Sequence, residues 1–214
     1  QAYLEGVQII ALTADRNPIF RGQMENQMIE QQDMYRTYCK KSVDLPTVTD
    51  DMNFKYCERL VNEALLELNH HGKGPVQINF PAFYGFKDFT VKELPKCRKI
   101  ERYEMKDSDE KWKEAVLKLE RSKRILLIYG ESHGYTEEDK KLLKLFFEKF
   151  DCVVSVEHMT NINTEETLRT YPFTESASGD DLTDVMPDIV ITLQGNFTSC
   201  IKEKLRDRNH NFSH

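Results

Sequence analysis

An arginine and two carboxamide side chains lie close together near the start of the chain. Arg16 directly follows Asp15, and Asn26 and Gln27 come a short way later. Guanidinium and amide groups are planar hydrogen-bond donors that suit a carboxylate or a phosphate. The alternative is that Arg16 pairs with Asp15 or Glu25 in a surface salt bridge. These residue types by themselves leave both possibilities open.

A short apolar strand is predicted directly before this cluster, at residues 7–12. A nearly continuous apolar run is typical of a parallel strand that is covered on both faces. The polar groups that follow would emerge at the carboxyl end of the strand, where ligands bind in open α/β sheets. Arg16, Asn26 and Gln27 are therefore candidates for an anion-binding group, and the surface ion pair of Arg16 remains the alternative.

Other strands and helices are predicted in both halves of the chain. In the first half we expect a short polar helix at 28–38, strands at 41–45 and 76–80, and an amphipathic helix from Asp50 or Asp51 to Gly72, with His70 and His71 in its last turn. In the second half we expect strands at 125–129, 152–156 and 188–193 and helices at 136–150, 182–185 and 199–206. This alternation predicts an α/β fold with a parallel, Rossmann-like sheet in three layers.

The predicted elements divide the chain into three parts. Residues 1–81 form an α/β segment, residues 82–122 a connector, and residues 123–214 a Rossmann-like domain. The connector is rich in aromatic residues and contains a predicted helix at 109–120. Such a segment is too apolar for a solvated linker, so we expect it to lie across a domain surface.

Composition narrows the class of protein. Of the 214 residues 39% are hydrophobic and 31% charged, as in an ordinary globular protein, and the net charge of -6 disfavours a nucleic-acid partner. No apolar run approaches the roughly 20 residues that cross a bilayer, so no membrane partner is expected. The five cysteines are dispersed without a C-x-x-C pair, which predicts free thiols and a cytoplasmic location. The chain begins with Gln1 and soon enters its first strand, so we expect a piece of a longer protein.

Four strings in the first part resemble thiamine-diphosphate-dependent enzymes in their order and spacing. They are Leu12-Thr13-Ala14-Asp15-Arg16, Gly22-Gln23-Met24-Glu25-Asn26-Gln27, Ser42-Val43-Asp44-Leu45-Pro46 and Gly74-Pro75-Val76-Gln77-Ile78-Asn79-Phe80-Pro81. The resemblance is closest to the menaquinone-pathway branch, whose members add a succinyl group from 2-oxoglutarate to isochorismate. It implies the C-terminal half of a pyrimidine-binding domain at 1–81 and a truncated central domain at 123–214.

The resemblance also implies roles for individual residues. Arg16, Asn26 and Gln27 would bind a substrate carboxylate, whereas residues 19–21 and 23–25 vary freely in such sequences. The family's cofactor-activating glutamate lies well before this segment, and its Gly-Asp-Gly…Asn motif, absent here, lies in a later domain. Thiamine diphosphate and Mg²⁺ would therefore be bound only by the full-length enzyme, a homodimer or homotetramer. This chain alone would hold no catalytic residue and no cofactor, and its partner would be the rest of its own polypeptide.

Two alternatives remain. The stretch Phe89-Thr90-Val91-Lys92-Glu93-Leu94-Pro95 resembles acetolactate-synthase-like proteins, which would act on pyruvate or another 2-oxo acid. A different class would be a non-catalytic domain that senses a small molecule in a crevice between two turns, with the lining residues Gly130, Ser132, Gly195 and Asn196. The first turn is G-x-x-x-G rather than a dinucleotide motif, and the acidic helix start that follows it disfavours phosphate.

Overall fold

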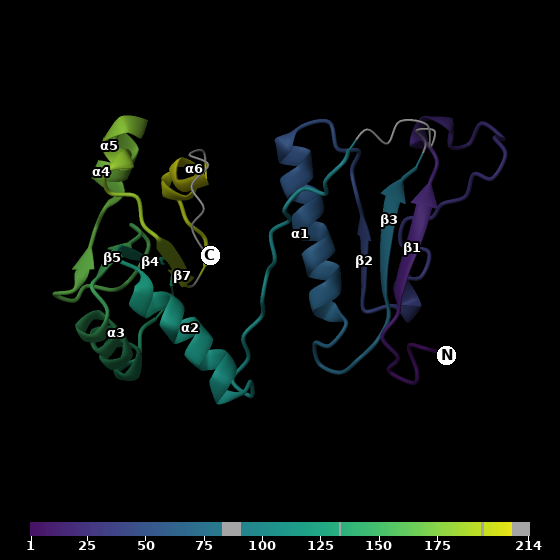
Figure 1. The fold of residues 1–214 in the computed structure, drawn as a ribbon. Coiled ribbons are helices and arrows are strands. Elements are labelled where there is room, and N and C mark those ends of the chain that lie inside the picture. Colours follow the sequence, from purple (N-terminus) through teal and green to yellow (C-terminus); the bar gives the residue numbers. More distant parts are fainter. Residues whose placement is uncertain (83–90, 133, 194, 207–214) are drawn as a thin grey trace. The chain divides into compact units, whose positions relative to one another are not determined.

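The computed structural model describes residues 1–82, 91–132, 134–193 and 195–206 (Figure 1). The chain divides into two compact units, Gln1–Glu104 and Met105–His214. Each unit has its own parallel sheet accompanied by helices, which confirms the predicted α/β class. The aromatic residues at 83–89 lie outside the described residues. The assignment of the units to a pyrimidine-binding and a central domain stays a prediction.

The first unit is built on a three-stranded sheet. Its elements are β1 (Ile10–Asp15), β2 (Lys41–Asp44), α1 (Asp51–Glu67) and β3 (Val76–Pro81), and the strand order is β1-β3-β2. Asp50 caps α1, because its carboxylate accepts from the Asn53 amide. Leu60 and Ala64 of α1 pack on Val43 and the apolar face of β3. The other face of the sheet carries polar side chains.

Strand β1 differs from the prediction in position and in burial. It covers residues 10–15 rather than 7–12, because Thr13 and Asp15 pair in register with the end of β3. Leu12 is 65% exposed, so the apolar run does not reflect cover on both faces within the described residues. In that part of the chain β1 is the edge strand of its sheet.

Two other predictions for this unit are wrong. Residues 28–38 form turns and a short 3-10 helix, Arg36–Tyr38, in place of the predicted helix. The side chain of Gln77 bonds the backbone of this segment, and Asp33 has a positive φ of 57°, which interrupts a helix. Helix α1 ends at Glu67, so the two histidines predicted in its last turn lie in the turn that follows it.

The second unit contains a four-stranded parallel sheet with the order β6-β5-β4-β7. Its strands are β4 (Ile125–Tyr129), β5 (Cys152–Val156), β6 (Thr167–Leu168) and β7 (Ile189–Leu193). Its helices are α2 (Asp109–Arg121), α3 (Glu137–Lys149), α4 (Tyr171–Ser176), α5 (Gly179–Thr183) and α6 (Ile201–Arg206). The sequence did not predict β6 or α4, and it placed α5 a few residues too late.

Helices cover both faces of this sheet. Leu127 points to the face covered by α3, where it packs with Leu143. Ile128, the next residue, points to the opposite face and packs with Leu182 of α5 and Ile201 of α6. This alternation of side chains confirms the predicted three-layer, Rossmann-like arrangement. Among the described residues, no helix has the length and apolar character needed to cross a membrane.

All five cysteines are free thiols, as predicted. Cys39 and Cys152 are buried, and burial raises the pKa of both thiols. A raised pKa keeps a thiol protonated and unreactive at neutral pH, so these two cysteines act as small packing residues.

The end of the first unit runs along α1 and is held there by polar side chains. Asn62 donates to the carbonyl of Arg98 at 2.9 Å and accepts from the amide of Ile100 at 2.8 Å. Arg102 forms a 2.9 Å ion pair with Glu67, the last residue of α1. Burial acts to raise the pKa of Glu67, but hydrogen bonds from Arg102 and His70 outweigh it and hold the pKa below 4.5.

Replacement of Glu67 by glutamine should make the stability of this unit less sensitive to acid. Because the folded-state pKa of Glu67 is lowered, its carboxylate stabilises the fold above pH 4.5, and this contribution is lost as the pH falls through the folded-state pKa. We expect Glu67→Gln to cost about 1 kcal/mol at pH 7 and almost nothing in strong acid. Amide hydrogen exchange of α1 across this pH range measures the difference.

Glu63→Gln is the matched control for this experiment. Glu63 also lies on α1, but its ion pairs with Lys41 and Arg59 are longer, at 3.4 Å and 3.6 Å, and its side chain is 37% exposed. We expect it to cost less than about 0.5 kcal/mol. An equal cost for both variants at pH 7 and pH 3 would contradict the role assigned to Glu67.

Candidate functional site

The polar face of the first sheet is buried. Adjacent strands place Thr13 beside Asn79, and Asn79 beside Asp44, on the same face. Gln77 and Asn79 of β3 are 0% and 1% exposed. Buried polar groups need hydrogen-bond partners, so this face must be covered by groups that donate and accept.

These partners come from the strands and from residues 16–31, which follow β1 and are called the covering segment below. Asn79 donates to the carboxylates of Asp44 and Asp15, and its carbonyl oxygen accepts from Thr13 at 2.8 Å. Gln77 donates to the hydroxyl of Thr13 at 3.1 Å and to a backbone carbonyl of the covering segment. The sheet and the covering segment therefore form one hydrogen-bonded network.

The predicted substrate-binding residues lie on this covering segment. Arg16 is the first residue beyond the carboxyl end of β1, and its guanidinium donates to the backbone carbonyl of Asn26. Gln27 comes next, with a positive φ of 58°. All three side chains are exposed. The structure thus brings Arg16 and Asn26 into contact, with Gln27 beside them in the chain.

Arg16 forms no ion pair with a carboxylate of the described residues. Asp15, which the sequence offered as a partner, accepts the backbone amide of Arg16 at 2.9 Å, and its side chain pairs with Arg21 at 2.7 Å. Glu25 is exposed and bonds to no described group. Most donors of the Arg16 guanidinium are therefore free to bind a carboxylate or phosphate.

Sequence reasoning missed three residues of this region. Arg21 stands in a stretch that was expected to vary freely, yet it pairs with Asp15. Gln77 and Asn79 stood within the strand predicted at 76–80 and within the family-like string at 74–81, but no role in the site was predicted for them. The one available signal was that both are amides on a strand whose neighbours also carry polar residues at matching positions.

The predicted crevice of the second unit is formed by two turns in direct contact. The amide of Gly130 donates to Leu193 and that of Glu131 to Asn196, at 2.9 Å and 3.0 Å. A Cβ atom on Gly195 would lie 2.6 Å from the carbonyl oxygen of Glu131. A ligand between these turns would have to separate backbone groups that now bond each other.

Ser132, the remaining residue of the predicted crevice, forms hydrogen bonds within its own turn. It is 7% exposed, and its hydroxyl donates to the carbonyl of Gly134 at 3.0 Å. Asn161 donates to the carbonyl of Ser132 at 3.2 Å. Its polar groups are thus used within the protein.

A carboxylate that the sequence did not reveal sits at the same end of the sheet. Glu157 follows β5 and is 5% exposed. It accepts from the hydroxyl of Thr198 at 2.9 Å and from the amide of Ser199 at 3.2 Å, just before α6. A phosphate that approached these amides would meet a negative charge already in place.

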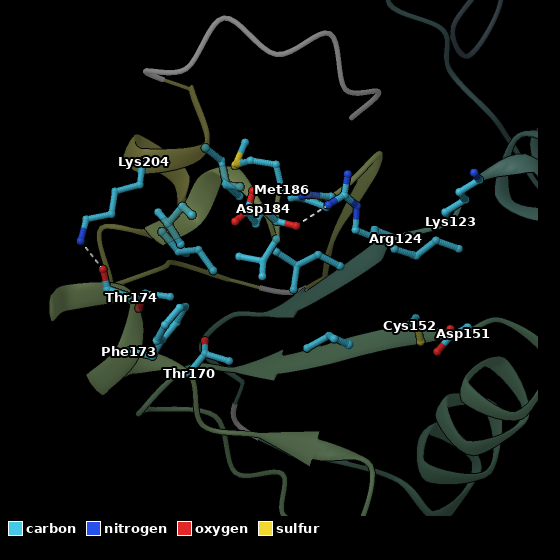
Figure 2. Close-up of a pocket in the computed structure, with 18 residues that line it drawn as sticks. Lys123, Arg124, Asp151, Cys152, Thr170, Phe173, Thr174, Asp184, Met186 and Lys204 are labelled. Atoms are coloured by element: carbon cyan, nitrogen blue, oxygen red, sulfur yellow. Dashed lines mark hydrogen bonds between the residues drawn. The ribbon is translucent and has the colours of Figure 1, made fainter. Parts of the chain in front are cut away.

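A cavity of about 430 Å³ lies at the opposite end of this sheet. Figure 2 shows mostly apolar side chains around it, with Arg124 reaching the backbone of Asp184 and Lys204 reaching that of Thr174. Arg124 and Asp151 directly precede strands, so the cavity lies at their amino ends. Ligands of open α/β sheets bind at the carboxyl ends, and the two cations already bond carbonyl oxygens.

The described residues offer no metal centre. Among them, no group of three His, Cys, Asp or Glu side chains is placed to hold a metal ion.

Comparison with known proteins finds relatives that share one name. The chain is 35% identical over 202 residues to a 2-succinyl-5-enolpyruvyl-6-hydroxy-3-cyclohexene-1-carboxylate synthase of Bacteroides fragilis, covering 93% of this chain and 36% of that protein. Proteins of the same name from Bacteroides thetaiotaomicron and Phocaeicola vulgatus are 34% and 33% identical, over 93% and 97% of this chain. The chain spans 36–38% of the length of these relatives. No family model matches it.

Proposed function

We propose that this chain, a homologue of the 2-succinyl-5-enolpyruvyl-6-hydroxy-3-cyclohexene-1-carboxylate synthases, is part of a thiamine-diphosphate-dependent enzyme of menaquinone biosynthesis. The observation that carries the proposal is similarity along almost the whole chain to relatives of that one name. The resemblance seen in the sequence is thereby confirmed, whereas the reaction of the complete protein is our proposal.

The reaction that we propose joins two carboxylate-bearing substrates. The enzyme would decarboxylate 2-oxoglutarate and add the succinyl group to isochorismate. Arg16, with Asn26 and Gln27, would bind a substrate carboxylate beyond the carboxyl end of β1, where its guanidinium pairs with no carboxylate in the described part of the chain. A charge-assisted hydrogen bond of this kind contributes roughly 1.5–3 kcal/mol.

We propose that the 214-residue chain does not turn over alone. Thiamine diphosphate and Mg²⁺ would be bound by other parts of a longer polypeptide, which would also be the partner of this chain in a homodimer or homotetramer. Thiamine diphosphate supplies a carbanion equivalent when it is bound. We place the protein in the cytoplasm because its five cysteines are free thiols.

An assay of the complete polypeptide tests the proposed reaction. With thiamine diphosphate and Mg²⁺ present, we expect CO₂ release from 2-oxoglutarate that depends on isochorismate. Release from pyruvate with no response to isochorismate would replace this function with that of an acetolactate-synthase-like enzyme. Loss of activity on removal of Mg²⁺ by a chelator, and its return on adding Mg²⁺, tests the cofactor assignment.

A thermal-shift measurement on the 214-residue chain tests the separate role of a small-molecule sensor. FAD, ADP, thiamine diphosphate with Mg²⁺, and the two substrates are each added in excess. A ligand at about 100 times its dissociation constant would stabilise the fold by roughly 2.7 kcal/mol. We expect no shift; a saturable shift with FAD or ADP would assign the second unit a ligand of its own.

A further inference from the structure

Arg21 forms an ion pair with a carboxylate at the end of strand β1. Its Nη2 atom lies 2.7 Å from Asp15 Oδ2, and the Asp15 side chain is only 8% exposed. Asp15 also accepts the amide of Arg16 at 2.9 Å and the side-chain amide of Asn79 at 3.2 Å. The buried carboxylate is therefore surrounded by donors, and Arg21 supplies the balancing charge.

Arg21 also joins the first part of the covering segment to its last part, near Glu30. Its Nη1 atom lies 3.1 Å from the carboxylate of Glu30, near the far end of that segment. Next to Glu30, Gln31 donates to the carbonyl of Ala14 at 2.9 Å. Residues 16–31 are thus tied to β1 through Arg21 and Gln31, and the exposed Arg16 lies at the start of this segment, next to Asp15.

The same geometry determines which arginine forms the ion pair with the buried carboxylate of Asp15. Arg16 and Arg21 both lie close enough in the chain to pair with Asp15, and the Arg16 amide already bonds it. Because Arg21 neutralises Asp15, the guanidinium of Arg16 turns to the backbone of Asn26 and stays exposed. Without Arg21, the unpaired buried carboxylate would attract the guanidinium of Arg16, its neighbour in the chain.

We propose that Arg21 is a positioning residue that keeps Arg16 available for the substrate by neutralising Asp15. The inference rests on the proposed function, in which Arg16 binds a substrate carboxylate. Arg21 itself does not touch the substrate. It acts through the charge of Asp15 and through the closure of the segment that carries Arg16.

The test measures KM and kcat of the complete polypeptide for its carboxylate substrates. We expect Arg21→Met to raise one KM about tenfold with kcat changed less than about threefold, because Arg16 is drawn away from the bound substrate. Asp15→Asn in the Arg21→Met background should restore most of this loss, since the competing charge is gone. Arg16→Met should raise the same KM, and the Arg16→Met/Arg21→Met double variant should be no worse than Arg16→Met alone.

Arg36→Met is the matched control, because Arg36 is an exposed arginine that follows in the same connection and pairs with no described carboxylate. We expect it to leave KM and kcat unchanged. An effect of Arg16→Met without one of Arg21→Met would overturn the positioning role alone. No effect of Arg16→Met would instead overturn the proposed substrate site. Additive losses in the double variant would show two independent roles and would also overturn the inference.

Two more conservative substitutions of Arg21 test the inference if Arg21→Met does not fold. Arg21→Lys retains the positive charge beside Asp15, whereas Arg21→Gln retains a donor without the charge. The inference predicts a nearly normal KM for the lysine variant and a raised KM for the glutamine variant. Equal KM values for the two variants would overturn it.

Discussion

Replacement of Arg16 by methionine should lower kcat/KM of the complete enzyme by about 10- to 100-fold, mainly through KM. Methionine keeps the length and apolar stem of the side chain but removes every donor and the charge. The exposed guanidinium uses one bond to the carbonyl of Asn26, and no described carboxylate competes for the rest. The loss corresponds to one charge-assisted contact with a substrate carboxylate.

Two further variants separate this role from a general effect of charge. Arg16→Lys keeps the charge without the planar fork, so we expect a KM between those of the wild type and Arg16→Met. Glu25→Gln changes an exposed charge in the same segment and should leave kcat/KM within about twofold, as expected for a solvent-screened group. If Arg16→Met reacts as fast as the wild type at low substrate concentration, the assigned site is wrong.

The polar face of the first sheet explains how an exposed arginine can be held in one place. Gln77 and Asn79 are fully buried and bonded. Gln77 joins Thr13 of β1 to the carbonyl of Gln31 in the covering segment, and Asn79 bonds Asp15, the partner of Arg21. A satisfied buried network is rigid, and a rigid support is what a binding group needs to keep its geometry. The site therefore depends on residues that never meet the substrate.

Local patterns predicted most of the elements of the fold. The helix predicted at 136–150 depends on a local pattern of residues, and α3 was found at that position. Strands β4, β5 and β7 were likewise identified from short apolar runs. The shift of β1 to residues 10–15 shows the limit of this reasoning, because that strand is extended by polar pairing with β3.

Only part of the candidate site could be predicted, because the rest depends on contacts between distant parts of the chain. Arg16 and Asn26 are close in sequence and could be found by residue type and resemblance. The role of Arg21 depends on Asp15 being buried by β3, and Glu157 meets Ser199 only after the second sheet has formed. Contacts between residues so far apart leave no local signal in one sequence.

The close approach of the two turns in the second unit leads to the largest expected effect on stability. Gly195 has no room for a side chain, because a Cβ atom there would lie 2.6 Å from the backbone oxygen of Glu131. Backbone atoms cannot move aside as a flexible side chain can. Relief of the clash would have to stretch the contact between Glu131 and Asn196, which joins the turns after β4 and β7.

We expect Gly195→Ala to destabilise the second unit by about 2–3 kcal/mol. Gly134→Ala is the matched control, because a Cβ atom on Gly134 would meet no atom within 4 Å. Reduced freedom of the unfolded chain should make the control neutral or slightly stabilising. Trp112 is the one tryptophan of the chain and lies on α2, so its fluorescence during urea unfolding reports on this unit alone. Equal urea midpoints for the two variants would mean that the turns are apart in solution. A ligand-accessible crevice between the turns would then again be a candidate site.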